Sequence, residues 1–214
     1  MSGKSGPTAA LLFGQGAGIP TGLYAALGLA IQEASPFPLW FASPQCPQDV
    51  AAIPGGLEVG MLRVRKAMRS QGIDWGSTST FYGGHSLGGA MMPDYVLGVD
   101  DAVGQVLMGS FLTRKFKTGA TAEGRPQLEY PVPTLTIGGE LDGLCRLTRI
   151  AEALYTQVTF AEDPTVAARS VPVTVIPGMN HYEFASGDQP PAFVAMNDLK
   201  AEITEEAAHA AGEC

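Results

Sequence analysis

The sequence has few of the residues that cross-link proteins or bind metals. Cysteine and histidine each occur only three times in 214 residues. The cysteines, Cys46, Cys145 and Cys214, have no C-x-x-C spacing, and an odd number argues against a disulfide framework. We therefore expect no metal, no cofactor and a reducing compartment.

Basic charge and long hydrophobic runs are also scarce. Thirteen Lys and Arg stand against 21 Asp and Glu, which gives a net charge of −8 without a basic run. A nucleic-acid partner is excluded on this ground, and a small, weakly charged ligand is expected. The apolar run at residues 9–13 is too short for a signal peptide or a membrane span. We expect a soluble, cytoplasmic protein without an integral membrane segment, or an organellar one if a targeting segment has been removed. The oligomeric state is left open.

Glycine is abundant, with 27 residues, and 45% of the chain is hydrophobic. This composition favours a single domain over residues 1–214 with many tight strand-to-helix junctions, and flexible ends at residues 1–7 and about 205–214. Apolar runs predict strands at residues 9–13, 39–42, 80–84, 102–108, 133–138 and 171–176. Helical spacing predicts helices at residues 20–34, 55–71, 87–97 and 144–158, with residues 109–130 as loop or one short helix and 198–214 as helix or fraying tail.

This alternation of strands and helices predicts the fold class. It is typical of an α/β protein with an open, mainly parallel, twisted sheet of about six strands and helices on both faces. Ligands of such sheets bind at the carboxyl ends of the strands. The candidate site should therefore consist of residues that directly follow strands.

A G-x-S-x-G pattern lies where the strand at residues 80–84 meets the following helix. Residues 84–88 read G-H-S-L-G. Such a turn exposes the serine, Ser86, in a strained conformation, and side chains at Gly84 or Gly88 would collide with the neighbouring helix and strand. The N–H of Leu87 could then point at an oxyanion. A glycine-rich turn without chemistry is the alternative.

A second glycine-rich loop, residues 14–20, follows the first strand. A dinucleotide-binding G-x-G-x-x-G would need glycine where Ile19 stands. The alternative is the second half of an oxyanion hole, with an N–H from Gln15 or Gly16.

Acidic residues and a histidine follow the last two predicted strands. Asp142 and His181 lie past strands, as Ser86 does, and their order along the chain is Ser, Asp, His. Glu140 and Asp163 are the alternative acids. His181 is the credible base, since the other histidines lie inside the G-H-S-L-G turn and in the C-terminal tail.

These motifs resemble those of a known family. The run from Phe13 to Tyr182 resembles a minimal α/β-hydrolase, the family of esterases, lipases, dienelactone hydrolases and chlorophyllases. Residues 84–89 are similar to its nucleophile elbow, 133–142 to its acid-bearing strand and loop, and 178–181 to its histidine loop. Departures are the absence of the first two strands, the absence of a large lid, and Phe13 where many members have histidine.

The resemblance implies a lidless serine esterase or lipase with a small-molecule ester as substrate. Ser86 would be the nucleophile, His181 the base and Asp142 the carboxylate that orients it. Short to medium acyl groups are expected, while acyl transfer, thioester hydrolysis and a non-catalytic small-ligand sensor stay as alternatives. For the pocket we predict an apolar wall with Arg114 and Lys115 at its rim. The wall residues would be Met91, Phe111, Leu112 and Met179.

Overall fold

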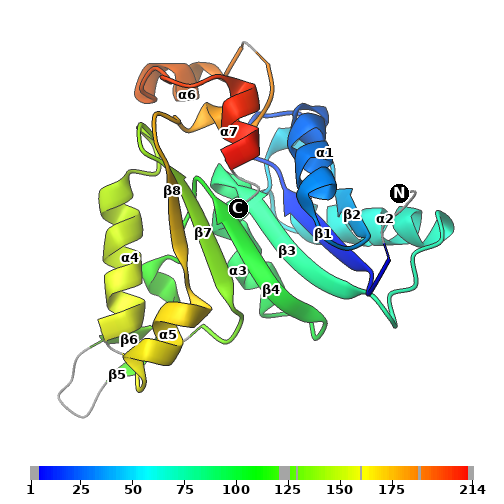
Figure 1. Cartoon of the computed structure of the whole chain (residues 1–214), viewed down its shortest axis with the longest axis horizontal. Helices are drawn as coiled ribbons and strands as arrows, with labels where there is room; N and C mark the ends of the chain where they lie inside the picture. Colours follow the sequence, from blue (N-terminus) through cyan, green and yellow to red (C-terminus); the bar gives the residue numbers. More distant parts are fainter. Residues whose placement is uncertain (1–4, 121–125, 129, 160, 188, 212–214) are drawn as a thin grey trace.

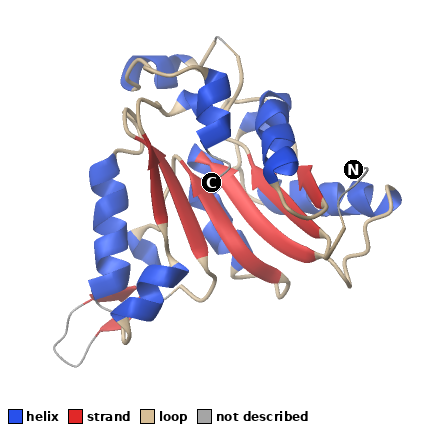
Figure 2. Cartoon of the chain, viewed as in Figure 1, coloured by secondary structure: helices blue, strands red, loops and turns tan. Residues whose placement is uncertain are grey.

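The structure is a computed structural model that describes residues 5–120, 126–128, 130–159, 161–187 and 189–211. Figure 2 shows strands enclosed by helices. The strands are β1 (Ala9–Gly14), β2 (Leu39–Ala42), β3 (Ser79–His85), β4 (Ala102–Met108), β5 (Lys117–Ala120), β6 (Pro126–Leu128), β7 (Thr134–Gly139) and β8 (Val173–Ile176). The α-helices are α1 (Ala25–Ala34), α2 (Gly56–Ser70), α3 (Ser86–Val96), α4 (Leu147–Thr159), α5 (Pro164–Ser170), α6 (Ala192–Asn197) and α7 (Glu205–Ala211). Four 3₁₀ turns are also described: η1 (Thr21–Tyr24), η2 (Pro47–Asp49), η3 (Arg114–Phe116) and η4 (Tyr182–Phe184).

Six strands form one sheet in the order β2-β1-β3-β4-β7-β8. Every pair within this sheet is parallel, which confirms the predicted α/β class. The chain first moves outward from β1 to β2 and then returns to place β3 on the other side of β1. The carboxyl ends of β1 and β3 therefore form a topological switch point, where open α/β sheets bind their ligands.

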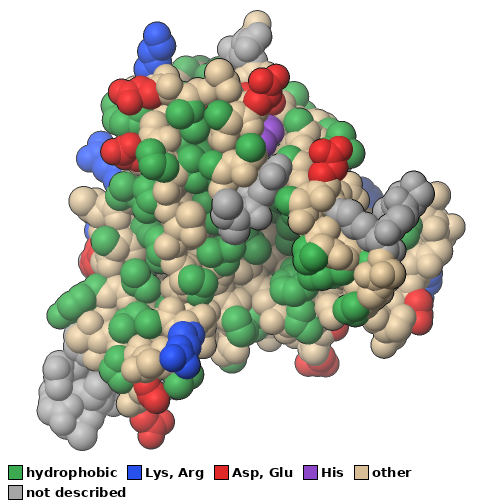
Figure 3. Space-filling model, viewed as in Figure 1, with side chains coloured by type: hydrophobic (Ala, Val, Ile, Leu, Met, Phe, Trp, Pro, Cys, Tyr) green, Lys and Arg blue, Asp and Glu red, His purple; other side chains and the backbone are tan. Residues whose placement is uncertain are grey.

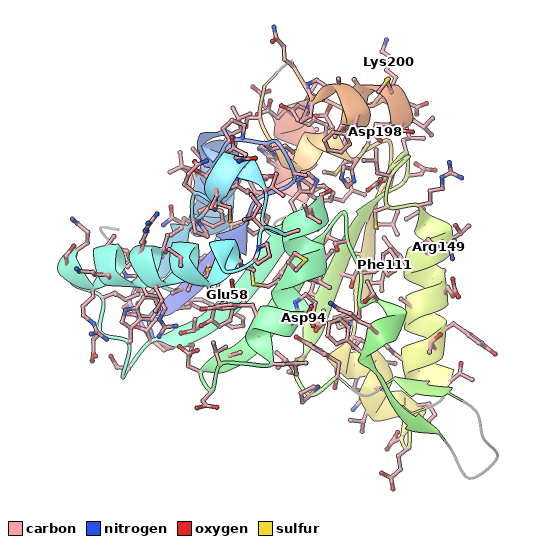
Figure 4. The ribbon with its side chains drawn as sticks, turned by 180° about the vertical axis from the view of Figure 1, so that it is seen from behind. Glu58, Asp94, Phe111, Arg149, Asp198 and Lys200 are labelled. Carbon is pink, nitrogen blue, oxygen red and sulfur yellow. The ribbon has the colours of Figure 1, made fainter. Side chains whose placement is uncertain are left out.

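Helices cover both faces of the sheet (Figure 1). Seen from behind, α2, α3 and α4 lie across one face (Figure 4). The core beneath α2 and α3 includes Leu12, Met61, Tyr82 and Met92. On the other face, α1 and α7 pack over a second core that includes Phe13. No helix in the described ranges is long and apolar enough to cross a membrane.

The structure adds elements that the sequence did not indicate. Residues 109–130, predicted as loop or one short helix, contain η3 and the two-stranded antiparallel sheet of β5 and β6. Helix α5 begins where Asp163 caps its first turn by accepting the N–H groups of Thr165 and Val166. Helix α6 follows Pro191. The tail forms α7 over part of its length, and residues 1–4 and 212–214 lie outside the described residues.

An apolar hollow of about 270 Å³ lies on the sheet face that carries α1. Leu11, Phe81, Val106 and Leu135 of the sheet line it together with Ile31 of α1. Hydrophobic side chains are prominent on the side of the molecule seen in Figure 3. Ser86, Asp142 and His181 are not among the residues that line the hollow, so we do not assign it to the candidate site.

A hydrogen-bonded ion pair stabilises the sheet near the start of β4. Arg65 of α2 donates to Asp101 Oδ2 (2.6 Å) and to the Tyr82 hydroxyl (2.8 Å), and Tyr82 donates to Asp101 Oδ1 (2.8 Å). The Arg65 guanidinium also lies 4.1 Å from the Trp75 ring centroid. Burial raises the pKa of Asp101, but the hydrogen bonds from Arg65 and Tyr82 outweigh burial and hold the pKa below its usual value.

Because of this ion pair, we expect part of the free energy of unfolding to be lost at acid pH. Because the folded pKa of Asp101 is lowered, its contribution is present above the unfolded pKa, near 3.9, and is lost as pH falls through the folded pKa. We expect Asp101→Asn to lower the free energy of unfolding at pH 7 by about 1 kcal/mol, a modest value because the carboxylate is partly solvated. Urea unfolding of the wild type and of Asp101→Asn at pH 7 and pH 3 measures the difference in their free energies of unfolding. A difference that is equally large at both pH values would contradict the role given to Asp101.

Candidate active site

Ser86 lies at the junction of β3 and α3, in a backbone conformation that residues other than glycine rarely adopt. Its φ is +52°, whereas the preceding His85 is extended, with φ −100° and ψ 139°. A positive φ costs a non-glycine residue about 1 to 3 kcal/mol, and such strain concentrates at functional sites. The chain thus turns sharply from strand into helix and leaves Ser86 half-buried at the carboxyl edge of the sheet.

The glycines around Ser86 allow this turn. A Cβ on Gly84 would lie 2.6 Å from the helix backbone at Gly88 and Gly89. A Cβ on Gly88 would lie 2.3 Å from the carbonyl oxygen of Gly14, at the end of β1. The first turn of α3 therefore touches the ends of both strands, and this close approach places Ser86 at the switch point.

This contact makes Gly88 a sensitive position. We expect Gly88→Ala to lower the free energy of unfolding by about 3 kcal/mol, because the added methyl group would collide with the backbone of Gly14 and Gln15. Gly22→Ala is the matched control, since a Cβ there has nothing within 4 Å. Urea denaturation of the three proteins measures the difference. If Gly88→Ala were as stable as Gly22→Ala, the close approach of α3 to β1 would be wrong.

Asp142 and His181 form a buried pair at the same edge of the sheet. The His181 Nδ1 atom lies 2.7 Å from Asp142 Oδ2, and the two residues are 1% and 4% exposed. The other carboxylate oxygen, Oδ1, accepts the N–H groups of Leu144 (2.9 Å) and Cys145 (2.5 Å). These backbone donors fix the carboxylate in the orientation that faces the histidine.

The contacts of this pair also determine the histidine tautomer. A carboxylate only accepts, so the proton of the neutral His181 ring lies on Nδ1 and Nε2 carries the lone pair. Nε2 is buried and has no hydrogen-bond partner among the described residues. It therefore makes no hydrogen bond to Ser86 in this structure, which holds no substrate; in enzymes, bonds between a base and a nucleophile often tighten only when substrate binds.

The other candidate acids and bases have different contacts. Glu140 accepts the N–H of Gly178 at 2.9 Å, and Asp163 caps α5. His209 is a buried residue of α7. Burial, followed by the charge of Asp142, raises the pKa of the Cys145 thiol, which keeps it protonated and a poor nucleophile.

One of the three predicted oxyanion donors, the N–H of Gly16, already has a hydrogen-bond acceptor. Leu87 is in the first turn of α3, where N–H groups have no intrahelical partner. Gly16 N–H instead donates to the Tyr24 hydroxyl at 2.8 Å, so its prediction as an oxyanion donor needs correction. The backbone N–H of Gln15 remains the candidate from this loop.

The Gln15 side chain has a supporting role that the sequence did not indicate. It is completely buried, donates to Ile19 O (2.8 Å) and Asp49 Oδ1 (2.9 Å), and accepts the N–H of Cys46 (2.9 Å). Asp49 itself has a positive φ of 57°. The amide of Gln15 therefore ties its own loop to the loop after β2.

Asp198 also contributes to the site, although the sequence did not indicate it. It follows α6, and in Figure 4 it lies at the same end of the molecule as Lys200. Its carboxylate accepts the N–H of Gly143 (3.0 Å) and that of Tyr182 (3.1 Å), the residues directly after Asp142 and His181. One side chain thus links the acid loop to the histidine loop, a role that depends on tertiary contacts with no sequence motif.

Only two of the four predicted pocket-wall residues have side-chain surface that a substrate could contact. Leu112 and Met179 are 2% and 1% exposed, the first packed with Leu107 and Phe116 and the second in the core beside α1, so they offer almost no surface to a substrate. Their prediction as wall residues needs this correction. Phe111 and Met91 are half-buried. Figure 4 shows Phe111 on the side of the sheet that carries α3 and α4.

The predicted rim residues can be described only in part. Lys115 is exposed and forms an ion pair with Asp94 of α3. The side chain of Arg114 lies outside the described residues. Within the described ranges, no group of three or more His, Cys, Asp or Glu side chains is placed to hold a metal ion.

Comparisons with known proteins show where this architecture recurs. A serine hydrolase homologue from Coxiella burnetii gives a TM-score of 0.56 at 12% identity, over 84% of this chain and 80% of that one. Carboxyl esterase 2 from the fungus Tuber melanosporum gives 0.53 at 13%, over 84% and 70%. An esterase domain from Rhodothermus marinus gives 0.51 at 14%, over 96% and 83%.

Sequence comparison adds nothing to these likenesses, because no protein-family model and no curated protein matches the chain. At such low identities, the structural likeness speaks for the fold and for no particular reaction. The protein therefore has an α/β-hydrolase fold, similar in structure to esterases and serine hydrolases.

Proposed function

We propose that the protein is a serine hydrolase that cleaves carboxylic esters through an acyl-enzyme on Ser86. One observation carries the proposal: within the described part of the chain, the buried Asp142–His181 pair leaves Nε2 of the histidine without a hydrogen-bond partner, at the carboxyl edge of the sheet where the strained Ser86 stands. A base held in one tautomer by a carboxylate, together with a serine at the same edge of the sheet, is the arrangement that acyl transfer uses.

The proposed reaction has two halves. His181 Nε2 takes the proton of the Ser86 hydroxyl as its oxygen attacks the ester carbonyl, and the N–H groups of Leu87 and Gln15 stabilise the tetrahedral oxyanion. The imidazolium, held by Asp142, then gives its proton to the leaving alcohol. In the second half, His181 takes a proton from water as the water oxygen attacks the acyl carbonyl. The imidazolium then gives this proton to the Ser86 oxygen as the acyl–oxygen bond breaks, which releases the acid and restores both residues.

The substrate class follows from the connections near Ser86. Only 56 positions separate Ser86 from Asp142 (142 − 86), and α3, β4, β5, β6 and β7 lie in this interval, so its described residues contain no lid domain. We propose an open site for short to medium acyl groups, with Phe111 and Met91 as apolar wall residues. Such a site gives no reason for activation at a lipid interface.

Pre-steady-state kinetics with p-nitrophenyl esters test the proposal. We expect a burst of p-nitrophenol equal to the enzyme concentration, followed by slower steady release, with turnover falling from butyrate to palmitate. A stoichiometric burst without later turnover would indicate a ligand sensor. The absence of both phases at every chain length would contradict the proposal.

A further inference from the structure

A chain of buried hydrogen bonds joins three loops around the candidate site. Gly16 N–H donates to the Tyr24 hydroxyl at 2.8 Å. That hydroxyl lies 2.8 Å from His85 Nδ1, and His85 Nε2 lies 3.0 Å from the carbonyl oxygen of His181. The loop after β1, the nucleophile elbow and the histidine loop are thus linked, although they are far apart in sequence.

The partners determine where each proton lies. A carbonyl oxygen only accepts, so His85 carries its proton on Nε2, and its Nδ1 accepts from the Tyr24 hydroxyl. Tyr24 in turn accepts from Gly16. Every group in the chain therefore uses its donor and acceptor capacity in one direction, from Gly16 to the peptide of His181.

This hydrogen-bond chain is shielded from solvent. Tyr24 and His85 are both 0% exposed, so water cannot replace a lost bond. The His85 ring lies 4.7 Å from that of His181 and 5.3 Å from that of Phe184, between centroids. A Cβ on Gly16 would lie 2.9 Å from His85 Nδ1, which shows how closely the loop approaches the elbow.

The protonation state of His85 is consistent with this geometry. Burial, and then the proximity of His181, hold the pKa of His85 well below its usual value. A neutral ring is what the chain needs, since an imidazolium could not accept from Tyr24. His85 is therefore a poor candidate for a second base, and it can hold its neighbours in place over the pH range in which an esterase works.

We propose that Tyr24 and His85 are positioning residues of the proposed hydrolase site. Their bonds hold the Gln15–Gly16 peptide, beside the proposed oxyanion donor, at a fixed place relative to the elbow and the His181 backbone. The inference rests on the proposed function. Because an oxyanion forms only in the reaction, a displaced donor lowers kcat and leaves KM unchanged.

Tyr24→Phe tests the inference against Tyr82→Phe. Both phenols are 0% exposed and hydrogen-bonded, but the Tyr82 hydroxyl contacts Arg65 and Asp101. We expect Tyr24→Phe to lower kcat by about tenfold with KM within about twofold, a smaller loss than removing an oxyanion donor outright. Tyr82→Phe should lower stability while kcat stays within about twofold. Equal effects of the two variants on kcat would overturn the inference.

Amide hydrogen exchange at Gly16 tests the chain without any substrate. In Tyr24→Phe the Gly16 N–H loses its acceptor, so its protection should fall by about tenfold beyond the global change seen in Tyr82→Phe. Unchanged protection of Gly16 would overturn the hydrogen-bond chain itself. A wild-type protein that hydrolyses no ester would overturn the proposed function and the catalytic role of the chain, so the two failures are distinguishable.

Discussion

Ser86→Ala is expected to reduce kcat for p-nitrophenyl butyrate by about 10⁶-fold, because the attacking oxygen is lost. The fold should not suffer. The Ser86 side chain is only half-buried, and alanine faces the same backbone strain at φ +52°. We therefore expect the free energy of unfolding to change by less than about 0.5 kcal/mol.

The control for this substitution is Ser43→Ala. The Ser43 hydroxyl is buried and has no hydrogen-bond partner among the described residues, and it has no part in the proposed mechanism. Its removal should leave kcat unchanged. If Ser86→Ala retained more than a hundredth of the activity while purified free of contaminating esterases, Ser86 would not be the nucleophile.

Asp142→Asn should cost about 10⁴-fold in kcat with little loss of structure. The reason lies in the two backbone donors at Oδ1, from Leu144 and Cys145. They require an oxygen at this position, so the asparagine NH₂ must occupy the place of Oδ2 and face His181 Nδ1. The histidine then accepts at Nδ1 and carries its proton on Nε2, where it cannot act as a base toward Ser86.

The matched control is Glu140→Gln, in the same loop. A glutamine oxygen can still accept the Gly178 N–H, so this variant should keep kcat within a few-fold. Steady-state kinetics and circular dichroism of both variants decide between them. A large loss in Glu140→Gln with full activity in Asp142→Asn would reverse the assignment of the acid.

The elbow could be predicted from the sequence because its requirements are local. Gly84 and Gly88 lie two residues before and after Ser86, and in the structure a Cβ added to either glycine would collide with the neighbouring backbone, as expected. The sheet was predictable for a similar reason, since continuous apolar runs such as residues 9–13 mark strands that are covered on both faces.

The surroundings of the site could not be predicted, because they depend on contacts between distant residues. The sequence left Glu140 and Asp142 as alternative acids, and only the fold shows which carboxylate faces His181. Likewise, Gly16 and Gln15 are adjacent in one loop, but Tyr24 occupies the N–H of the first.

Side-chain burial was equally hidden. Leu112 and Met179 follow strand ends, as residues that line a site do, yet they pack into cores formed with other elements. The roles of Asp198 and His85 depend on hydrogen bonds to the backbone of other loops. No short motif indicates such bonds, because almost every residue type at the partner position has the same backbone groups, proline without its N–H being the exception.

Active-site labelling followed by peptide mapping tests the central claim most directly. The protein is treated with a fluorophosphonate probe, digested, and the phosphonylated residue is identified by mass spectrometry. The account predicts one adduct per chain, on Ser86, and slow labelling in Asp142→Asn because His181 can no longer activate the serine. An adduct on another residue, or labelling that persists in Ser86→Ala, would contradict it.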